Sequence, residues 1–323
     1  IDVSDHLRLL GTAHVATSSV EAVQHHIDAS PGLPAESNFS TREVIDGFKQ
    51  LKNSALGLDG ISKSIIFPIL AIISPAVAML FAALLRFSVS PSDWRIAVLA
   101  LIRKKGASKI DLNNFRAVHL LSFFYKWFTR CLRDRILPFV SDQIPQQQRG
   151  FIDGGSCAQA LLALLTAAQR ETRDFGHLFA CFIDIRKAFP RVRREILYRK
   201  MARLGIPAIY IKCLYALYTD IQGSVRSSAG FCAPFQISQG TREGCIMSPL
   251  LFVIFFSDVI DELEKVHLEA GTVMLGPLAL FAILFADDLV LLARTIKDLQ
   301  ALINAFAIIC DKSHQQVAVD KTE

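Results

Sequence analysis

The sequence predicts an α+β fold in which a small antiparallel sheet is backed by helices. Apolar runs of strand length at 178–183, 278–285 and 289–293 predict the sheet, and a tight turn joins the last two runs. Apolar residues at helical spacing predict the backing helices at 191–204, 249–265 and 297–311. We expect the strand at 178–183 to lie beside the hairpin.

Aspartates stand at the ends of these predicted strands. Asp287 and Asp288 lie at the tip of the hairpin, and Asp184 directly follows the strand at 178–183. Neighbouring carboxylates raise each other's pKa unless a cation neutralises them, and Mg²⁺ binds one or two carboxylates together with water and substrate phosphates. The hairpin alone is also compatible with an exposed Asp-Asp turn. The third aspartate favours a site for two metal ions that catalyses phosphoryl transfer.

A glycine-rich segment at 239–249 lies between the two acidic sites. Gly240 and Gly244 leave bare backbone that a nucleotide or a template strand can approach closely. Ser248 can cap the helix that follows, with Pro249 in its first turn.

Charge is distributed unevenly along the 323 residues, which are enough for one large domain or two closely packed ones. The net charge is +5, but residues 86–203 carry 22 Lys or Arg against nine Asp or Glu. Such a basic section is typical of proteins that bind a phosphate backbone. Solvated helix faces are the alternative explanation for part of it.

Apolar content is high, with 52% hydrophobic residues and a mean hydropathy of +0.37. Residues 65–85 approach the length of a membrane span, but Pro68 and Pro75 interrupt them, so we predict a buried helix and no membrane. The seven cysteines form no CxxC pair, and no secretory signal peptide is evident. We predict reduced core cysteines and an intracellular protein.

Taken in order, these motifs resemble those of reverse transcriptases of the non-LTR retrotransposon family. The first palm motif of that family is similar to residues 182–189, the second to 240–252 and the third to 285–288. Further upstream, 57–61, 93–106 and 113–116 resemble its fingers, and 148–156 resembles the segment that leads into the palm. The resemblance extends from about residue 41 to the end of the chain.

The resemblance implies a right-hand polymerase fold, with a fingers subdomain over 1–175, a palm over 176–323 and the thumb missing. It implies an RNA-directed DNA polymerase that copies RNA into DNA by two-metal nucleotidyl transfer, as a fragment of a retrotransposon polyprotein. Two alternatives stay open. One is a catalytically decayed copy that only binds nucleic acid, and the other is a maturase-like or telomerase-like relative.

The resemblance also assigns the site. Two Mg²⁺ ions, with Mn²⁺ as a substitute, would be held by Asp184, Asp287, Asp288 and the backbone carbonyl of Ile185. Nucleotide binding falls to Lys104, Arg116, Phe189, Glu243, Gly244 and Lys321. Nucleic-acid binding falls to Arg103, Lys105, Arg149, Gly150, Ser248 and Phe285. The implied partners are an RNA template, a DNA primer and dNTPs, in the nucleus or in a cytoplasmic ribonucleoprotein, and no protein partner can be inferred.

Within that site, Phe189 would lie under the sugar of the incoming nucleotide and exclude a 2′-hydroxyl, although it could instead pack at the start of the following helix. Lys321 would protonate the departing pyrophosphate. The chain departs from the family at four positions. Glu243 stands where the family usually has Gln, Ala117 where it has Pro, Pro190 where it has Asp, and Ala318 where it has Asn.

Overall fold

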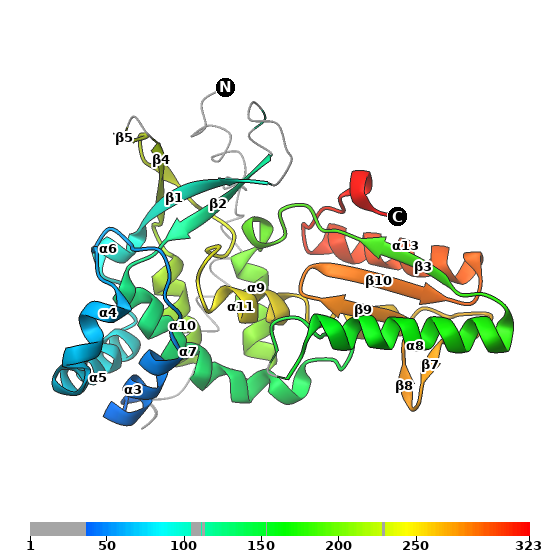
Figure 1. The fold of residues 1–323 in the computed structure, drawn as a ribbon, viewed down its shortest axis with the longest axis horizontal. Coiled ribbons are helices and arrows are strands. Elements are labelled where there is room, and N and C mark those ends of the chain that lie inside the picture. Colours follow the sequence, from blue (N-terminus) through cyan, green and yellow to red (C-terminus); the bar gives the residue numbers. More distant parts are fainter. Residues whose placement is uncertain (1–36, 105–110, 112–113, 153, 228–229) are drawn as a thin grey trace. The chain divides into compact units, whose positions relative to one another are not determined.

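A computed structural model describes residues 37–104, 111, 114–152, 154–227 and 230–323 (Figure 1). The chain forms two compact units, and each unit is assembled from two separate stretches. The first unit comprises the described residues up to Phe139 together with Arg194–Ser248. The second unit comprises Val140–Arg193 and Pro249–Glu323.

The first unit contains a mixed sheet, with strand order β2-β1-β4-β5 and with β6 paired to β4. Its strands are β1 (Ile96–Arg103), β2 (Phe115–Leu120), β4 (Gln222–Ser227), β5 (Gly230–Phe231) and β6 (Phe235–Gln236). β1 pairs antiparallel with β2, so that Ile102 lies opposite Arg116, and parallel with β4. β1 lies within one of the segments that resemble the family's fingers, 93–106, and β2 begins at the end of another, 113–116.

The first unit also contains an aromatic cluster among its helices. The helical elements of this unit are α3 (Thr41–Gln50), α4 (Lys63–Ile66), η2 (Phe67–Ile69), α5 (Leu70–Phe87), α6 (Ser92–Arg95), α7 (Phe123–Val140), α9 (Arg194–Arg203) and α10 (Ala208–Tyr218). Rings from α3, α5, α6 and α7 form the cluster. The rings of Phe48 and Phe81 meet Trp127 edge-on, and the Trp127 indole donates to the carbonyl of Val44 at 2.8 Å. Aromatic rings packed edge to face in this way stabilise the fold by more than their buried apolar area alone would.

Helix α5 lies within the apolar stretch 65–85. The described helical segment Lys63–Phe87 is long and apolar enough to cross a bilayer by length and composition. In the structure α5 packs against α3 and α10, and it buries Val77, Phe81 and Leu85 on that side. Core helices of globular proteins pass the same test of length and composition. The opposite side of the helix is exposed, with Ile72 79% and Met79 75% accessible, so the predicted burial of this helix is only partial. The absence of a membrane span stays a prediction.

The second unit contains the sheet that the sequence predicts. β9 (Ala282–Phe285) and β10 (Asp288–Ala293) form the hairpin, and β3 (Phe179–Ile183) pairs antiparallel with β10. The run 278–285 is not one strand, however. Its first part is β8 (Leu278–Ala279), which pairs with β7 (Met274–Leu275) in a separate ribbon.

Helices cover this sheet on both faces (Figure 1). The helical elements are α8 (Cys157–Phe175), α11 (Ser248–Phe255), α12 (Val259–Glu264) and α13 (Ile296–Lys312), with 3₁₀ turns η4 (Ser141–Gln143), η5 (Phe189–Arg191) and η6 (Val319–Lys321). α8 packs on β9, where Ala160 and Ala167 join a core with Ile283 and Leu292. α13 packs on β10 and β3.

The predictions for two of the backing helices are partly wrong. The helix predicted at 249–265 is interrupted between α11 and α12, where the Ser257 hydroxyl donates to the carbonyl of Ile254 at 2.9 Å and so competes with the helical backbone. The helix predicted at 191–204 exists as α9, but it packs against α10 in the first unit.

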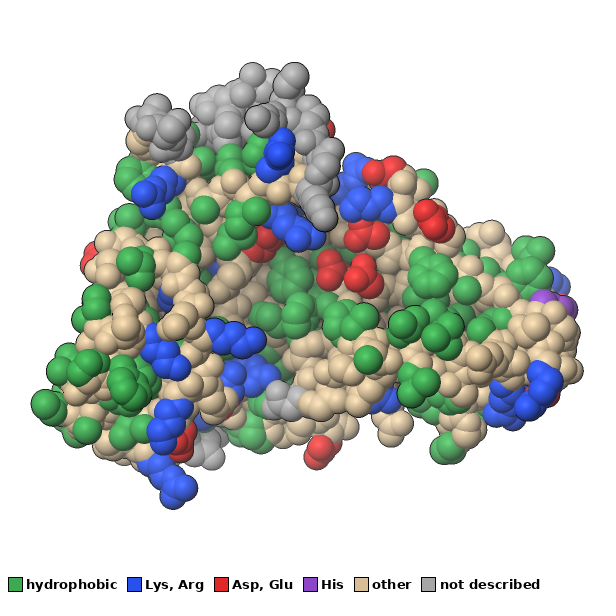
Figure 2. Space-filling model, viewed as in Figure 1, with side chains coloured by type: hydrophobic (Ala, Val, Ile, Leu, Met, Phe, Trp, Pro, Cys, Tyr) green, Lys and Arg blue, Asp and Glu red, His purple; other side chains and the backbone are tan. Residues whose placement is uncertain are grey.

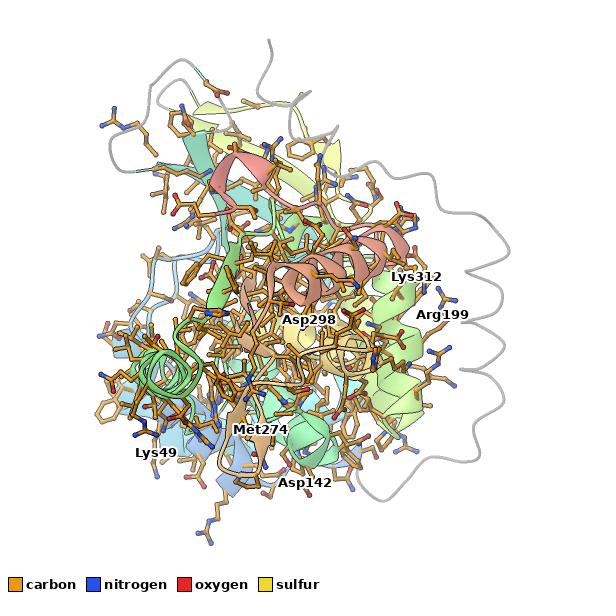
Figure 3. All side chains as sticks on the ribbon, turned by 90° about the vertical axis from the view of Figure 1, so that its right-hand side faces the viewer. Lys49, Asp142, Arg199, Met274, Asp298 and Lys312 are labelled. Atoms are coloured by element: carbon orange, nitrogen blue, oxygen red, sulfur yellow. The ribbon has the colours of Figure 1, made fainter. Side chains whose placement is uncertain are left out.

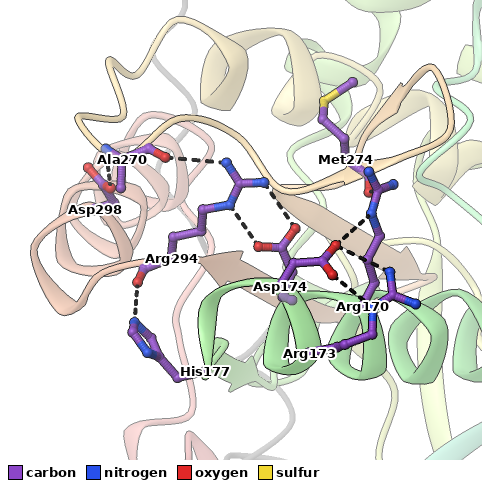
Figure 4. A network of polar contacts seen from close by, with 9 residues as sticks. Arg170, Arg173, Asp174, His177, Ala270, Met274, Arg294 and Asp298 are labelled. Atoms are coloured by element: carbon purple, nitrogen blue, oxygen red, sulfur yellow. Dashed lines mark hydrogen bonds and ion pairs between the residues drawn. The ribbon is translucent and has the colours of Figure 1, made fainter.

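An ion pair links α8 to the residue that follows β10 (Figure 4). Arg294, at the end of β10, donates to both carboxylate oxygens of Glu171 at 2.7 and 3.0 Å, and Glu171 is buried. The carboxylate of Asp298, in the first turn of α13, accepts from the backbone of Glu269 and Ala270 at 2.8 and 3.0 Å. Figure 3 shows Asp298 and Lys312 towards opposite ends of α13.

The predicted boundary between fingers and palm at residue 175 stays a prediction, although the compact units divide the chain elsewhere. α8 packs with the sheet of the second unit, and Arg194–Ser248 belongs to the first. Five of the seven cysteines are buried and all are free, as predicted for core residues, whereas Cys157 is exposed and Cys232 is partly exposed.

Candidate active site

The acidic turn is a two-residue hairpin connection. Phe285 pairs with Asp288 across the hairpin, so that Ala286 and Asp287 form the loop. Ala286 has a φ of +63°, a conformation that an L-residue other than glycine adopts at a cost in free energy. Figure 2 shows acidic side chains gathered at this end of the sheet.

Asp184 reaches the same end of the sheet from the neighbouring strand. Leu289 lies opposite Ile183 in the ladder, so Asp184 follows β3 where β10 begins. Burial raises the pKa of the Asp288 carboxyl, and the negative charge of Asp184 raises this pKa further. The structure therefore brings the two carboxylates within electrostatic range of each other, as the sequence predicts.

A lysine supplies a cation at this place. The Nζ atom of Lys321 lies 2.6 Å from Oδ2 of Asp184, and its positive charge partly offsets the rise in the pKa of Asp288. The chain around it runs along the edge of β3, where Ala318 donates to the carbonyl of Asp184 at 2.8 Å and Ile185 pairs with Val317. The predicted nucleotide-site residue Lys321 is thus fixed beside Asp184 by backbone pairing.

The donor set suits a hard divalent cation. Carboxylate oxygens are the ligands that Mg²⁺ prefers, and the mutual repulsion of Asp184 and Asp288 is the electrostatic condition that a cation relieves. Within the described part of the chain, however, no three His, Cys, Asp or Glu side chains form a ready-made metal cluster. The carboxylates that would hold a metal are present, but they are not arranged as a closed cage.

Phe189 lies five residues after Asp184 and begins η5. Its ring stacks on Phe252 with the ring centroids 4.9 Å apart, and it meets Phe151 edge-on at 6.0 Å. Part of the ring stays exposed. Phe189 therefore packs at the start of a short helical turn, as one of the two predictions stated, and its proposed role under a sugar stays a prediction.

Three of the predicted nucleic-acid-binding residues lie against the turn. Gly150 is buried, and a Cβ atom placed on it would lie 2.2 Å from the backbone nitrogen of Ala286. The backbone of Arg149 donates to the carbonyl of Leu284 at 2.8 Å, and Phe285 belongs to the hairpin itself. Gly150 thus has a structural reason to be glycine, and its contact with nucleic acid stays a prediction.

The remaining site residues belong to the first unit. Arg103 and Arg116 are exposed on β1 and β2, and Lys104 follows β1, where its backbone donates to the carbonyl of Asn114 at 2.8 Å. Lys105 lies outside the described residues. The two strands therefore bring three of the four predicted basic residues to one end of the same ribbon.

The glycine-rich segment forms a loop that packs on β2. The carbonyl of Glu243 accepts from the backbone of His119 at 2.9 Å. Gly244 has a φ of +97°, and a Cβ atom there would lie 3.2 Å from the carbonyl oxygen of His119. Ser248 starts α11, but its buried hydroxyl donates to the carbonyl of Arg242 at 2.8 Å. This bond is not the helix cap that the sequence predicts.

Two buried arginines that the sequence analysis did not single out hold this loop. Arg194 donates to the carbonyls of Ile237, Gln239, Gly240 and Tyr218 at 2.9–3.2 Å. Arg242 is only 2% exposed, its guanidinium lies over the rings of Tyr125 and Tyr218, and it donates to the carbonyl of Leu217 at 3.0 Å. Sequence gives little signal for either, because an arginine is expected on the surface, and Arg194 in addition falls within the basic section 86–203.

A family model described as "Reverse transcriptase (RNA-dependent DNA polymerase)" matches residues 102–323. Among curated proteins, the chain is 27% identical over 222 residues to the "Probable RNA-directed DNA polymerase from transposon BS" of Drosophila melanogaster, covering 67% of this chain and 24% of that protein. It is 28% identical over 269 residues to a Pol polyprotein from the type-1 retrotransposable element R2 of Nasonia vitripennis, covering 82% of this chain and 24% of the relative.

Solved structures of similar fold include telomerases. Apo telomerase from Candida tropicalis, truncated from its C-terminal domain, aligns with a TM-score of 0.53 at 13% identity, covering 73% of this chain and 51% of that one. Telomerase from Candida albicans with a fragment of telomeric RNA aligns with a TM-score of 0.51 at 13% identity, covering 73% and 44%. At this identity the likeness concerns the fold, and it confirms the predicted polymerase fold class. The chain spans about a quarter of the length of the curated relatives it matches.

Proposed function

The chain belongs to the reverse transcriptase family, and we propose that it carries the RNA-directed DNA polymerase activity of a non-LTR retrotransposon. The observation that carries the proposal is the carboxylate pair at one end of the second unit's sheet. The negative charge of Asp184 raises the pKa of Asp288, and the ammonium group of Lys321 lies beside Asp184. Acids in this arrangement, next to an ammonium group, suit the binding of phosphates and of a divalent cation.

Two Mg²⁺ ions, or Mn²⁺ in their place, are proposed at Asp184, Asp287 and Asp288, with the backbone carbonyl of Ile185 as a further ligand. When bound, such ions lower the pKa of an attacking hydroxyl and stabilise the charge on a departing pyrophosphate. The chain's own contribution is to hold the carboxylates on two adjacent strands of one sheet. Lys321 can leave Asp184 and donate a proton to an anion held there, because its Nζ is on a flexible stem.

The nucleotide and nucleic-acid contacts are proposed on the same basis. Arg116 and Lys104, at the end of the β1–β2 ribbon, would contact the triphosphate, since guanidinium and ammonium groups pair with phosphate oxygens. Glu243 and Gly244 would line the base and template side. Arg103, Lys105, Arg149, Gly150, Ser248 and Phe285 would contact the RNA template and the DNA primer. The basic section 86–203 supports binding to a phosphate backbone.

Phe189 is proposed to select deoxynucleotides by a steric clash with a 2′-hydroxyl. Its partly exposed ring, backed by Phe252, supports this role, because a gate must be rigid and must also face the substrate. Phe189→Val should raise the ratio of ribonucleotide to deoxynucleotide kcat/KM by about 100-fold while cutting deoxynucleotide use only modestly. An unchanged ratio, measured by single-nucleotide incorporation, contradicts the gate.

An intracellular location, in the nucleus or in a cytoplasmic ribonucleoprotein, is part of the proposal. The free cysteines support it, since buried thiols of this kind suit a reducing compartment. We propose no membrane association for the chain and infer no protein partner.

The proposed function is tested by extension of a DNA primer on an RNA template. The 323-residue chain is incubated with dNTPs and with Mg²⁺ or Mn²⁺, and products are compared with those on a DNA template and with NTPs. The proposal expects metal-dependent extension on RNA with dNTPs. A chain that binds the primer–template but never extends it would favour the catalytically decayed copy.

A further inference from the structure

The acidic turn is supported by a segment that lies far from it in the sequence. Residues 147–149 run beside β9, where the backbone of Leu284 donates to the carbonyl of Gln147 at 2.9 Å and the backbone of Arg149 donates to the carbonyl of Leu284 at 2.8 Å. Gln148 forms a parallel bridge with Leu284. The segment thus follows the strand to the point where the turn begins.

The side chain of Gln148 reaches the turn itself. Its Oε1 atom accepts from the backbone nitrogen of Ala286 at 3.0 Å and from that of Gly150 at 2.8 Å. The side chain is only 3% exposed, and Ala286 is buried as well. A buried N–H without a partner is costly, and both donors here converge on one oxygen.

The backbone of Ala286 gives this contact its importance. Its φ of +63° is unfavourable for alanine, so the surroundings must hold it in place. The backbone of Gly150 is in close contact with the backbone of Ala286, because a Cβ atom on Gly150 would lie 2.2 Å from the Ala286 nitrogen. A hydrogen bond and a close backbone contact therefore converge on the residue immediately before Asp287.

The chemistry of the acceptor also matters. A glutamate could accept the same two hydrogen bonds, but it would bury a further negative charge beside the acidic turn. A neutral carboxamide accepts both hydrogen bonds without adding a charge beside the aspartates.

We propose that Gln148 is a positioning residue that fixes the Ala286–Asp287 turn for nucleotidyl transfer. This inference rests on the proposed function for its catalytic consequence, while the hold on the turn is a property of the chain alone. It concerns a residue that acts through the backbone of the turn and does not touch the substrate.

The experiment compares Gln148→Met with Gln147→Met. Methionine keeps the length of the side chain and removes the acceptor. Gln147 is the matched control, because it lies in the same segment and its amide donates to the carbonyl of Ala279 at 3.0 Å, away from the turn. Hydrogen exchange is measured on peptides that cover residues 281–290, and kcat and KM for dNTP are measured on primed RNA.

Gln148→Met should speed exchange in the turn by about tenfold, as expected for the loss of one buried hydrogen bond. It should lower kcat by about 100-fold, since small misplacements of reacting groups are costly, and leave KM within about twofold. Gln147→Met should leave the exchange of the turn and kcat at the wild-type values, whatever it does to the melting temperature.

Wild-type exchange of the turn in Gln148→Met, or equal losses in both variants, would overturn the proposal. If the wild-type chain makes no DNA, the proposed function fails, and the exchange comparison still decides whether Gln148 holds the turn.

Discussion

Two loops, one in each unit, are held by opposite chemistry. In the second unit, the backbone N–H of Ala286 is held by the neutral carbonyl of Gln148. In the first unit, backbone carbonyls of the loop at 237–240 are held by the charged guanidinium of Arg194. One loop presents donors and is held by an acceptor, and the other presents acceptors and is held by a group that only donates.

The difference follows from the charge that each loop carries. The turn bears two aspartates, so a neutral acceptor avoids adding to their repulsion. The glycine-rich loop turns several carbonyls inward, and one guanidinium with its five donors satisfies them together. The comparison predicts that the turn is sensitive to negative charge and that the loop is sensitive to the loss of donors.

The largest effect on activity is expected when one aspartate of the acidic turn is neutralised. Asp287→Asn should lower the rate of nucleotide incorporation by about a thousandfold or more, because a neutral amide is a poor ligand for a divalent cation. The free energy of unfolding should stay unchanged or rise slightly, since one repelling charge is removed. Asp311→Asn, an exposed change on α13, is the control that should retain wild-type activity. Near-wild-type nucleotide incorporation by Asp287→Asn would contradict the assignment of Asp287 as a metal ligand.

The next effect concerns the donors of the first unit. Arg194→Met should lower the free energy of unfolding by about 3 kcal/mol, because buried carbonyls lose a charged donor. Arg194→Lys should recover less than half of this loss, since an ammonium group cannot reach the same set of carbonyls. Chemical denaturation measures both.

Arg199→Met is the matched control on the same helix. Arg199 is exposed and points away from α9 (Figure 3), so its loss should change the free energy of unfolding by less than about 0.5 kcal/mol. If Arg194→Met is no more destabilising than Arg199→Met, the guanidinium does not hold the loop.

A pH effect should follow from His119, which packs against the loop. Burial lowers the pKa of this imidazole to about 3, and the positive charges of Arg242 and Arg194 contribute to the lowering. The ring is therefore neutral in the folded chain, whereas it binds a proton near pH 6.5 in the unfolded chain. Stability should be lost as the pH falls from about 6.5 towards 3, by about 2 kcal/mol at pH 5.

His119→Asn should flatten this dependence between pH 7 and pH 5, as measured by the free energy of unfolding. The variant is first shown to be folded at pH 7. A slope equal to that of the wild type would mean that other groups cause the acid sensitivity.

The smallest effect on activity is expected from a change at Glu243. Its backbone carbonyl accepts the hydrogen bond that joins the loop to β2, and its side chain adds a negative charge. Glu243→Gln should lower the KM for dNTP by about threefold or leave it unchanged, with the effect shrinking at high salt. The backbone bond to His119 is retained in this variant. A clear rise in KM would show that the carboxylate has a positive role in this chain.

The sequence predicts the palm sheet and its acids because the signals are local. Strand-length apolar runs that end in Asp184 and Asp287 determine both the sheet and the place of the charges, and the register confirms the expected neighbours. The sequence does not reveal the break between α11 and α12, because Ser257 competes with the helix through a side-chain hydrogen bond that leaves the apolar periodicity unchanged.

The supports of the site could not be predicted. Gln148 and Ala286 are 138 residues apart, and no pattern in either segment announces their contact. Arg194 lies in the basic section 86–203, yet its guanidinium donates to carbonyls inside the first unit. Such contacts depend on how distant elements pack, and a single sequence records only the residue types.

The most direct test of the acidic site is Mn²⁺ binding to the chain itself, followed by electron paramagnetic resonance and competed with Mg²⁺. The site as described predicts binding that weakens by about tenfold or more in Asp184→Asn and in Asp287→Asn, because each variant removes an anionic ligand. It also predicts tighter binding in Lys321→Met, which removes the ammonium group beside Asp184. Equal Mn²⁺ affinity in the wild type and in both aspartate variants would contradict the account.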